Sequence, residues 1–486
     1  MGSVTSVEGM NVARDRGPDQ GEGVAYFTPA ERAARGKAAR AEVRRRAHGR
    51  WEPSALRRSP VELLEAQASE RLPELGPIRY GRMLASPFAF FRGAAYVMAA
   101  DLADGTRTGL HAQLCGDAHL ANFGVFRSPD RRLVFSINDF DETLPGPFEW
   151  DVKRLAASVA VAGRERGFDD RSRRAAVLAT VRVYRQAMAR FASMRNVDVW
   201  YTRLDVASIA QRLTGSASTK ELQRFERNIT AAAKKDSERA LAKLCRSVEG
   251  EYRIVGRPPL ITPIEDVLPG AEQEHLETVI RRMIASYRAT LLGDRRKLLE
   301  RYRYVHAARK VVGVGSVGTR TWILLLIGRD EGDPMFLQFK EAQASVLEPF
   351  LGRSEFELHG QRVVEGQRVM QAAPDVLLGW ERIVTIDGQE KDFYIRQLWD
   401  AKGSADVESM DSNVLATYGT ICGWTLARAH ARTGDPIAIS AYLGSNDTFD
   451  RALADFAETY ADQNERDFET LRQAVSSGQI AAQTGI

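Results

Sequence analysis

Four polar residues that could hold a metal ion lie in two neighbouring stretches of the sequence. The stretches are "CGDAHLANFGVF", residues 115–126, and "FSINDFDETLPGPFEWD", residues 135–151. The four residues are Asp117, Asn122, Asp139 and Asp141. Carboxylates flanked by core-forming residues are costly to bury unless a cation pairs with them. Carboxylate and amide oxygens suit magnesium. The pattern therefore predicts a magnesium site with Asn122, Asp139 and Asp141 as ligands.

The spacing of Asp117 and Asn122 predicts a catalytic role for the aspartate. The two residues are five positions apart, as in the D-x-x-x-x-N catalytic loop of protein kinases. In that loop the aspartate accepts the proton of the attacking hydroxyl and the asparagine binds magnesium. We therefore predict that Asp117 is the catalytic base. Structural capping by these acidic residues is the alternative that this stretch alone leaves open.

A glycine-rich segment, "GVGSVGTR", follows about 200 residues later and contains Gly313, Gly315 and Gly318. A helix directly after it would indicate a dinucleotide site, but the apolar run "TWILLLIG" predicts a strand instead. A glycine-rich loop between two strands is the protein-kinase arrangement, in which the loop covers the phosphates of ATP. A plain glycine-rich hairpin is the alternative.

Lys340, in the apolar strand "FLQFKEA", stands where that arrangement needs a lysine. We predict that its ammonium contacts the α- and β-phosphates and that a helix glutamate holds it. Glu365, in "GQRVVEGQRVMQAA", is the predicted partner. Glu357 is the rival, but it lies at capping-box spacing from Ser354. A solvent-facing lysine and solvated glutamates are the alternative.

The first two stretches together resemble the catalytic segment of small-molecule kinases of the aminoglycoside phosphotransferase and choline kinase type. The family pattern is H-G-D-x-H-x-x-N, then I-D-F/W-D/E, then an aspartate before a helix. The matching positions here are Gly116, Asp117, His119, Asn122, Asp139, Phe140, Asp141 and Asp151. The resemblance implies that Asp151 braces the catalytic loop and that His119 is structural. Cys115 replaces the first histidine of the pattern.

The whole chain also resembles a bacterial family known only as a domain of unknown function. The phrases that carry this resemblance include "RYGRM", "SPFAFFRGAA", "CGDAHLANFG" and "RQLWDAKGS". In ordinary kinases the glycine-rich loop and lysine precede the catalytic loop, whereas here they follow it. A circular permutation explains this order, with the helix of residues 422–435 leading into the catalytic loop. An accidental half-signature is the rival explanation.

The elements around these residues predict an α+β fold, namely a circularly permuted, two-lobe protein kinase-like fold. A small antiparallel β-rich lobe is inserted after a large helical lobe. The predicted parts are a disordered tail (1–22), a helical lobe with the catalytic and metal-binding loops (23–305), a β-rich nucleotide-binding lobe (306–402) and C-terminal helices that pack on the helical lobe (403–486). Strands are predicted at "RLVFSINDF", "TWILLLIG", "MFLQFKEA", "DVLLGWERIVTI" and "DFYIRQLWD", and helices at 172–194, 218–248 and 271–304.

Composition excludes several classes of protein. The net charge of +4 is small for 486 residues, and no basic stripe with interleaved aromatic residues predicts nucleic-acid binding. Three scattered cysteines form neither a disulfide framework nor a zinc pattern. The first twenty residues lack the apolar core of a signal peptide, and no run reaches the roughly 18 apolar residues of a membrane span. We therefore expect a cytoplasmic protein without membrane or nucleic-acid partners; the sequence does not indicate its oligomeric state.

The sequence predicts an ATP- and Mg²⁺-dependent phosphotransferase whose partners are a nucleotide and an unidentified hydroxyl acceptor, either a small molecule or a protein. Two alternatives stay open. The same site could orient ATP for adenylyl transfer, because fold does not fix chemistry, or the protein could be a non-catalytic, nucleotide-sensing pseudokinase. Arg79, Arg82 and Arg92 lie just before the catalytic loop, and we expect one of them to contact phosphate or an acidic substrate.

Overall fold

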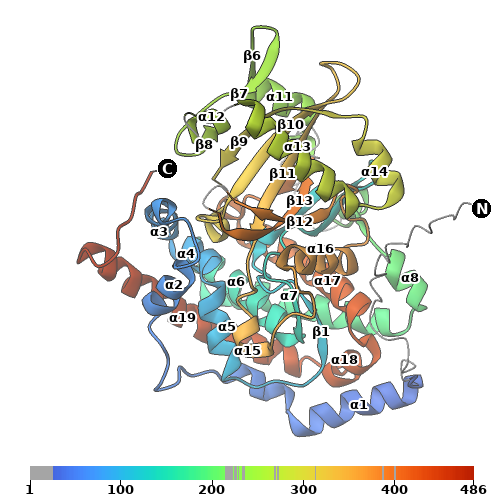
Figure 1. The fold of residues 1–486 in the computed structure, drawn as a ribbon. Coiled ribbons are helices and arrows are strands. Elements are labelled where there is room, and N and C mark those ends of the chain that lie inside the picture. The colour runs from blue at the N-terminus through green and yellow to red at the C-terminus, as the bar shows by residue number, and fades with distance from the viewer. Residues whose placement is uncertain are drawn as a thin grey trace, which may run out of the picture.

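A six-stranded antiparallel sheet forms the upper part of the protein in the computed structural model (Figure 1). Its strand order is β12-β13-β11-β10-β9-β8. The strands are β8 (Ile261–Pro263), β9 (Arg303–Lys310), β10 (Thr321–Ile327), β11 (Pro334–Ala342), β12 (Gly379–Val384) and β13 (Glu390–Gln397). The predicted strands "TWILLLIG" and "MFLQFKEA" are confirmed as β10 and β11, and they form a hairpin in which Ile327 pairs with Pro334.

The structure describes residues 26–485, except 214–222, 224–226, 228, 232–235, 268–269, 271–272, 312, 386–387 and 399–400. The predicted disordered tail, residues 1–22, and much of the predicted helix 218–248 lie outside the described residues.

Elements before residue 306 pack around the same sheet. Helices α11 (Ser237–Leu244), α12 (Ile264–Val267), α13 (Gln273–Ala289) and α14 (Gly293–Leu299) contribute apolar residues to the two cores on its faces. The division predicted between residues 305 and 306 therefore falls inside this group of elements. The sheet also includes β8, a three-residue strand that comes before residue 306.

Residues 245–248, predicted as helix, are instead a strand, β6 (Cys245–Val248), which pairs with β7 (Glu251–Ile254). The reason is the two-residue turn between them. Glu249 and Gly250 both have positive φ values, 53° and 83°, and this backbone matches the twist of a tight hairpin.

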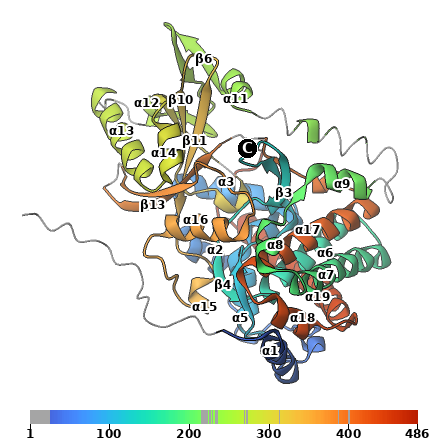
Figure 2. The ribbon, with the colours of Figure 1, turned by 90° about the vertical axis from the view of Figure 1, so that its right-hand side faces the viewer.

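Helix α16 (His359–Met370) lies below the sheet, between it and the larger helical part (Figure 2). The predicted capping box at Ser354 and Glu357 is wrong, because the helix begins five residues after Ser354. Asp392 on β13 accepts the His359 N–H at 2.8 Å, while Ser354 accepts the Phe356 N–H. The helix is thus capped by a strand distant in sequence, which local spacing cannot reveal.

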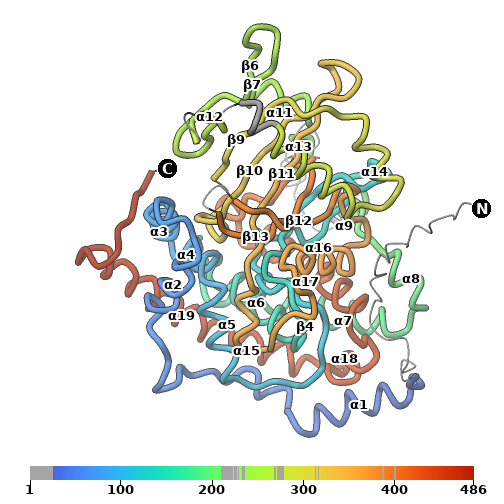
Figure 3. The backbone as a smooth tube through the Cα atoms, in the orientation of Figure 1, coloured from blue at the N-terminus to red at the C-terminus, as the bar shows by residue number. Residues whose placement is uncertain are grey.

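The larger part is mainly helical and combines both ends of the chain (Figure 3). Its helices are α1 (Pro29–Glu42), α2 (Pro60–Ala68), α3 (Gly76–Met83), α4 (Pro87–Gly93), α5 (Ala95–Ala103), α6 (Glu149–Glu165), α7 (Asp170–Ala192), α8 (Asn196–Tyr201), α9 (Val206–Leu213), α15 (Glu348–Leu351), α17 (Ser412–Thr433), α18 (Pro436–Leu443) and α19 (Thr448–Ser476). The predicted helix 172–194 is confirmed as α7, and its periodic apolar residues are buried.

Two small antiparallel sheets carry the predicted catalytic segment. β1 (His111–Leu114) pairs with β4 (Leu144–Pro147), and β2 (Phe123–Arg127) and β3 (Leu133–Ile137) pair within a sheet of order β14-β2-β3-β5. The flanking strands are β5 (Leu204–Asp205) and β14 (Gly403–Ser404). The protein is a mixed α+β structure, as predicted. No helix in the described part of the chain is both long and apolar enough to cross a membrane.

Candidate active site

One cavity of about 220 Å³ lies between the β-rich part and the helical part. It brings together most of the predicted site residues, although they come from segments about 200 residues apart. Those in its lining are Asp117, His119, Asn122, Asp139, Gly313, Gly315 and Lys340. Asp141, Asp151, Gly318 and Glu365 are not in the lining. The cavity thus has an acidic wall from the helical part and a basic wall from the sheet.

The loop that carries Asp117 is held rigidly at its base. Asp151, in the first turn of α6, accepts the N–H groups of Cys115 and Gly116 at 2.8 and 3.1 Å. Gly116 has a φ of 81°, and a Cβ there would lie 2.3 Å from the Glu142 carbonyl oxygen. His430 of α17 lies 3.2 Å from Asp151. These contacts fix the loop between β1 and the following 3₁₀ turn (Leu120–Asn122).

His119 faces Asp117 but stays neutral at ordinary pH. Its Nε2 lies 3.6 Å from Asp117 Oδ2. Burial lowers the pKa of His119 to about 3, despite the nearby carboxylate. A histidine that cannot be protonated near neutral pH fits the structural role implied by the resemblance.

Arg154, which the sequence analysis missed, binds Asp117 directly. Its Nε and Nη2 lie 2.9 and 2.8 Å from Oδ1 of Asp117, and Nη2 also donates to the Phe91 carbonyl at 2.6 Å. The guanidinium lies over the Phe91 ring. Arg154 is itself buried, and in the sequence it is only one of several charged residues in "WDVKRLA". Arg154 therefore ties the loop of Asp117 to α4.

Asn122 and Asp139 are the residues that could hold a cation. Asn122 Nδ2 donates to the Asp117 carbonyl at 2.9 Å, so its amide oxygen is the atom available to a metal. Loss of hydration and the neighbouring Asp141 raise the pKa of Asp139, and a bound cation would offset both effects. No group of three or more His, Cys, Asp or Glu residues among the described residues could hold a metal ion. The pair suits Mg²⁺, which takes one or two protein carboxylates and completes its shell with water and substrate phosphates.

Asp141 pairs with Lys340, joining the two walls of the cavity. The ammonium of Lys340 contacts Asp141 Oδ2, and the Tyr394 hydroxyl donates to Oδ1 at 2.8 Å. Burial alone would raise the pKa of Asp141, but Lys340 lowers it to about 2. Burial likewise opposes the charge on Lys340, yet Asp141 outweighs it and raises the pKa of the lysine. Asp141, predicted as a metal ligand, is the counter-ion of Lys340 in the structure.

The predicted pair between Lys340 and a helix glutamate is replaced by this contact. Glu365 instead pairs with Arg368 one turn along α16, at 2.8 Å. Glu357 has a side chain that is 89% exposed and lies 3.8 Å from Arg382. Asp141 reaches Lys340 because it follows the short strand β3 on the facing wall, a contact that no local pattern in the sequence predicts.

The glycine-rich loop lies between β9 and β10 and is fastened to the segment after α2. Arg71 Nη1 donates to the Gly315 and Val317 carbonyls, and the Leu72 N–H donates to the Gly318 carbonyl at 2.8 Å. Gly318 has a φ of 97°, which only glycine adopts easily. Gly315 lies close to the backbone of Arg92. The loop thus covers the cavity in a fixed position.

Three further cations line the cavity: Arg92, Arg396 and Lys402. Arg396 Nε donates to Gln338 at 3.0 Å, and Arg396 and Lys402 both approach the Asn138 carbonyl at 3.4 Å. Loss of hydration and the adjacent Arg396 lower the pKa of Lys402 to about 7. Arg396 and Lys402 could not be predicted as site residues, because single basic residues near a strand end form no recognisable pattern.

Of the three arginines before the catalytic loop, only Arg92 lines this cavity. Its Nε is buried and has no hydrogen-bond partner within the described part of the chain. Arg79 is buried elsewhere and donates to Gln67 and to the Gly93 carbonyl. A buried donor without a partner is costly, so Arg92 is suited to receive an anionic ligand.

Residues 71–474 match the model of a family described as "Uncharacterized protein conserved in bacteria (DUF2252)". This match covers most of the chain, and the protein belongs to that family. No curated protein and no solved structure matches the chain.

Proposed function

We propose that this protein is an ATP- and Mg²⁺-dependent phosphotransferase that acts on a hydroxyl group of a small molecule or a protein. One observation carries the proposal. Asp117, Asn122 and Asp139 share a single cavity with Lys340 and the glycine-rich loop, although the two sets are far apart in the sequence and in the reverse of the usual kinase order. If the catalytic segment and the glycine-rich segment with Lys340 were unrelated, there would be no reason for them to line the same cavity.

The arrangement of the sheet supports the proposal. A glycine-rich loop joins β9 and β10, the lysine lies on β11, and α16, β12 and β13 follow. Protein kinases place their glycine-rich loop, lysine and helix in this order. The proposed circular permutation is supported at the other join, because the Gln113 N–H on β1 donates to Thr433 Oγ1 at the end of α17, at 3.1 Å.

The proposed chemistry relies on positioning and charge neutralisation. Arg154 engages Oδ1 of Asp117, so Oδ2 is the oxygen that would accept the proton of the acceptor hydroxyl. Lys340 would contact the α- and β-phosphates, and Arg92 would contact the transferred phosphoryl group from the side of the catalytic loop. Mg²⁺, held by Asn122 and Asp139, would neutralise the charge of the β- and γ-phosphates when bound.

The test combines binding and turnover. Thermal unfolding should shift upward when ATP and Mg²⁺ are added together, because ligands stabilise the state that binds them. ATP consumption is then measured with a bacterial metabolite extract, and products are identified by mass spectrometry. A product carrying phosphate supports the proposal. A product carrying AMP would indicate adenylyl transfer, a large shift without any consumption would indicate a nucleotide sensor, and no shift at all would refute nucleotide binding.

A further inference from the structure

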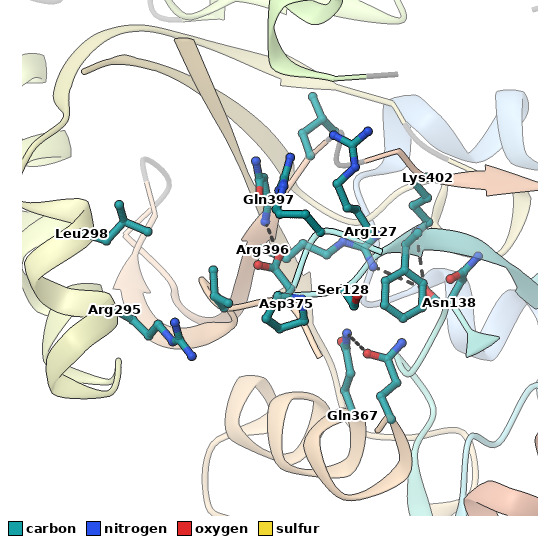
Figure 4. A pocket seen from close by; sticks show the side chains of 16 residues that line it. Arg127, Ser128, Asn138, Arg295, Leu298, Gln367, Asp375, Arg396, Gln397 and Lys402 are labelled. Carbon is teal, nitrogen blue, oxygen red and sulfur yellow. Dashed lines mark hydrogen bonds between the residues drawn. The ribbon is translucent and has the colours of Figure 1, made fainter. Parts of the chain in front are cut away.

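A second cavity, of about 280 Å³, adjoins the first and is shown in Figure 4. Its walls come from the β2–β3 turn, α14, the end of α16 and the end of β13. The two cavities share Asn138, Arg396 and Lys402, which form the partition between them. Asp117 lines only the first cavity. A ligand confined to the second cavity would therefore be out of reach of the proposed base.

The charge of this second cavity is strongly biased. Its lining contains five basic residues, Arg127, Arg131, Arg295, Arg396 and Lys402, and one acidic residue, Asp375. The two carboxylate oxygens of Asp375 accept backbone N–H groups, from Leu377 at 2.8 Å and from Gln397 at 2.6 Å. Arg295 also contacts Asp294, at 3.3 Å. The lining thus carries more basic than acidic side chains, an environment that favours an anion.

Neutral polar groups complete the lining. Gln367 and Gln371 hydrogen bond to each other at 3.0 Å, and Ser128 and Gln397 lie on the other walls. Figure 4 shows Gln367 and Arg396 on opposite sides of the space. Arginine guanidinium groups bind phosphate through two parallel hydrogen bonds, and amide and hydroxyl groups suit sugar hydroxyls. The volume is near the lower limit of small-molecule sites.

We propose that the second cavity is a binding site for a small phosphate monoester, such as a sugar phosphate, distinct from the catalytic cavity. The proposal does not depend on the phosphotransferase activity. Because Arg396 and Lys402 belong to both linings, the ligand would lie close to the proposed metal site without taking part in the reaction.

Isothermal titration calorimetry with inorganic phosphate and with glucose 6-phosphate tests this site. The variants are Arg127→Ala/Arg295→Ala, which alters only the second cavity, and Lys340→Met, which alters only the first. Arg132→Ala is the matched control, because Arg132 lies in the same turn but outside the lining and has a side chain that is 66% exposed. We expect the double variant to bind both probes at least tenfold more weakly, and the other two variants to bind like the wild type. Tighter binding of glucose 6-phosphate than of phosphate would identify the ester as the ligand class.

Several results would overturn the proposal: no saturable binding of either probe, loss of binding in Lys340→Met alone, or an equal loss in Arg132→Ala. If the double variant does not fold, Leu298→Glu replaces it. Leu298 lines the cavity and is 39% exposed, so the chain should tolerate a carboxylate there, and the added negative charge should weaken binding of both probes to the same degree. Unchanged binding in Leu298→Glu would equally refute the site.

Discussion

The two carboxylate oxygens of Asp117 have different surroundings. One oxygen is engaged by Arg154, whose side chain is only 4% exposed, and the loop itself is braced by Asp151. The other oxygen faces neutral His119. If Asp117 is the proposed base, it would lose little orientational freedom when a substrate binds, which is the form of preorganisation that positioned acid–base groups need.

Replacing Asp117 with Asn should reduce the turnover of ATP by about 10²- to 10⁴-fold, the usual contribution of a general base. Nucleotide affinity should change little, because the residue would act on the acceptor. Asp139→Ala should abolish turnover and also remove the dependence of ATP binding on Mg²⁺. Rates are measured by ATP consumption and binding by titration with and without EDTA. Full activity in either variant would exclude the assigned roles.

Lys340 and Asp141 form an ion pair whose partners depend on each other. Lys340→Met removes the cation and leaves Asp141 beside a largely apolar group. The side chain of Asp141 is 25% exposed, so water reduces the penalty, and we expect a loss of about 2 to 3 kcal/mol in the free energy of unfolding.

The double variant Lys340→Met/Asp141→Asn should regain much of that stability while ATP binding stays weak. The free energy of unfolding is measured by chemical denaturation, and ATP affinity by titration, for the wild type, for Lys340→Met and for the double variant. Equal destabilisation in the single and double variants would show that the ion pair does not couple the two walls.

At the scale of elements, the strands and long helices follow from local patterns, whereas the contacts between them do not. The apolar runs that formed β10 and β11, and the three- and four-residue spacing that formed α7, were readable in the sequence. The cap of α16 by Asp392 was not, because the donor and acceptor lie on elements 33 residues apart.

The same limit applies to the site. The sequence predicted Asp117, Asn122, Asp139 and Lys340 because their spacing follows a known pattern. It could not predict Arg154 or Arg396, since each acts through a contact between distant elements. The predicted partner of Lys340 was Glu365 on α16, whereas the observed partner is Asp141 after β3. Which of the two carboxylates reaches the lysine depends on how the sheet packs against the helical part.

Two glycines of the glycine-rich loop, Gly318 and Gly313, can be compared because only Gly318 has a positive φ. A Cβ at Gly318 would require an L residue at a φ of 97° and would lie 2.9 Å from Arg71 Cβ. We expect Gly318→Ala to lower the free energy of unfolding by about 1 to 3 kcal/mol and to weaken ATP binding, because Arg71 also holds the loop.

Gly313→Ala is the control, since a Cβ at Gly313 meets no atom within 4 Å. Its thermal unfolding temperature should match that of the wild type. If both variants unfold alike, the conformation of Gly318 does not set the position of the loop.

At the scale of the whole molecule, the first and last described segments are packed into one core. His48, in the 3₁₀ turn Arg45–Gly49, contacts the Tyr442 hydroxyl of α18 at 2.7 Å, and its ring also packs edge-on against Phe449 of α19. The side chain of His48 is fully buried. The join between the two ends of the chain therefore contains a histidine that water cannot reach.

Acidification should weaken this join. Burial and the nearby Lys153 lower the pKa of His48 from 6.5 to about 3, so below pH 6.5 the unfolded chain binds a proton that the folded protein excludes. The contribution of His48 to the free energy of unfolding is complete above pH 6.5 and decreases by about 1.4 kcal/mol per pH unit as the pH falls toward 3.

His48→Gln should therefore lose stability less steeply than the wild type between pH 6.5 and 5, measured by urea denaturation. His111→Gln, at an exposed position, should keep the wild-type slope. A slope in His48→Gln that equals the wild-type slope would mean that His48 is protonated in the folded protein, and that the two ends of the chain separate enough to admit water.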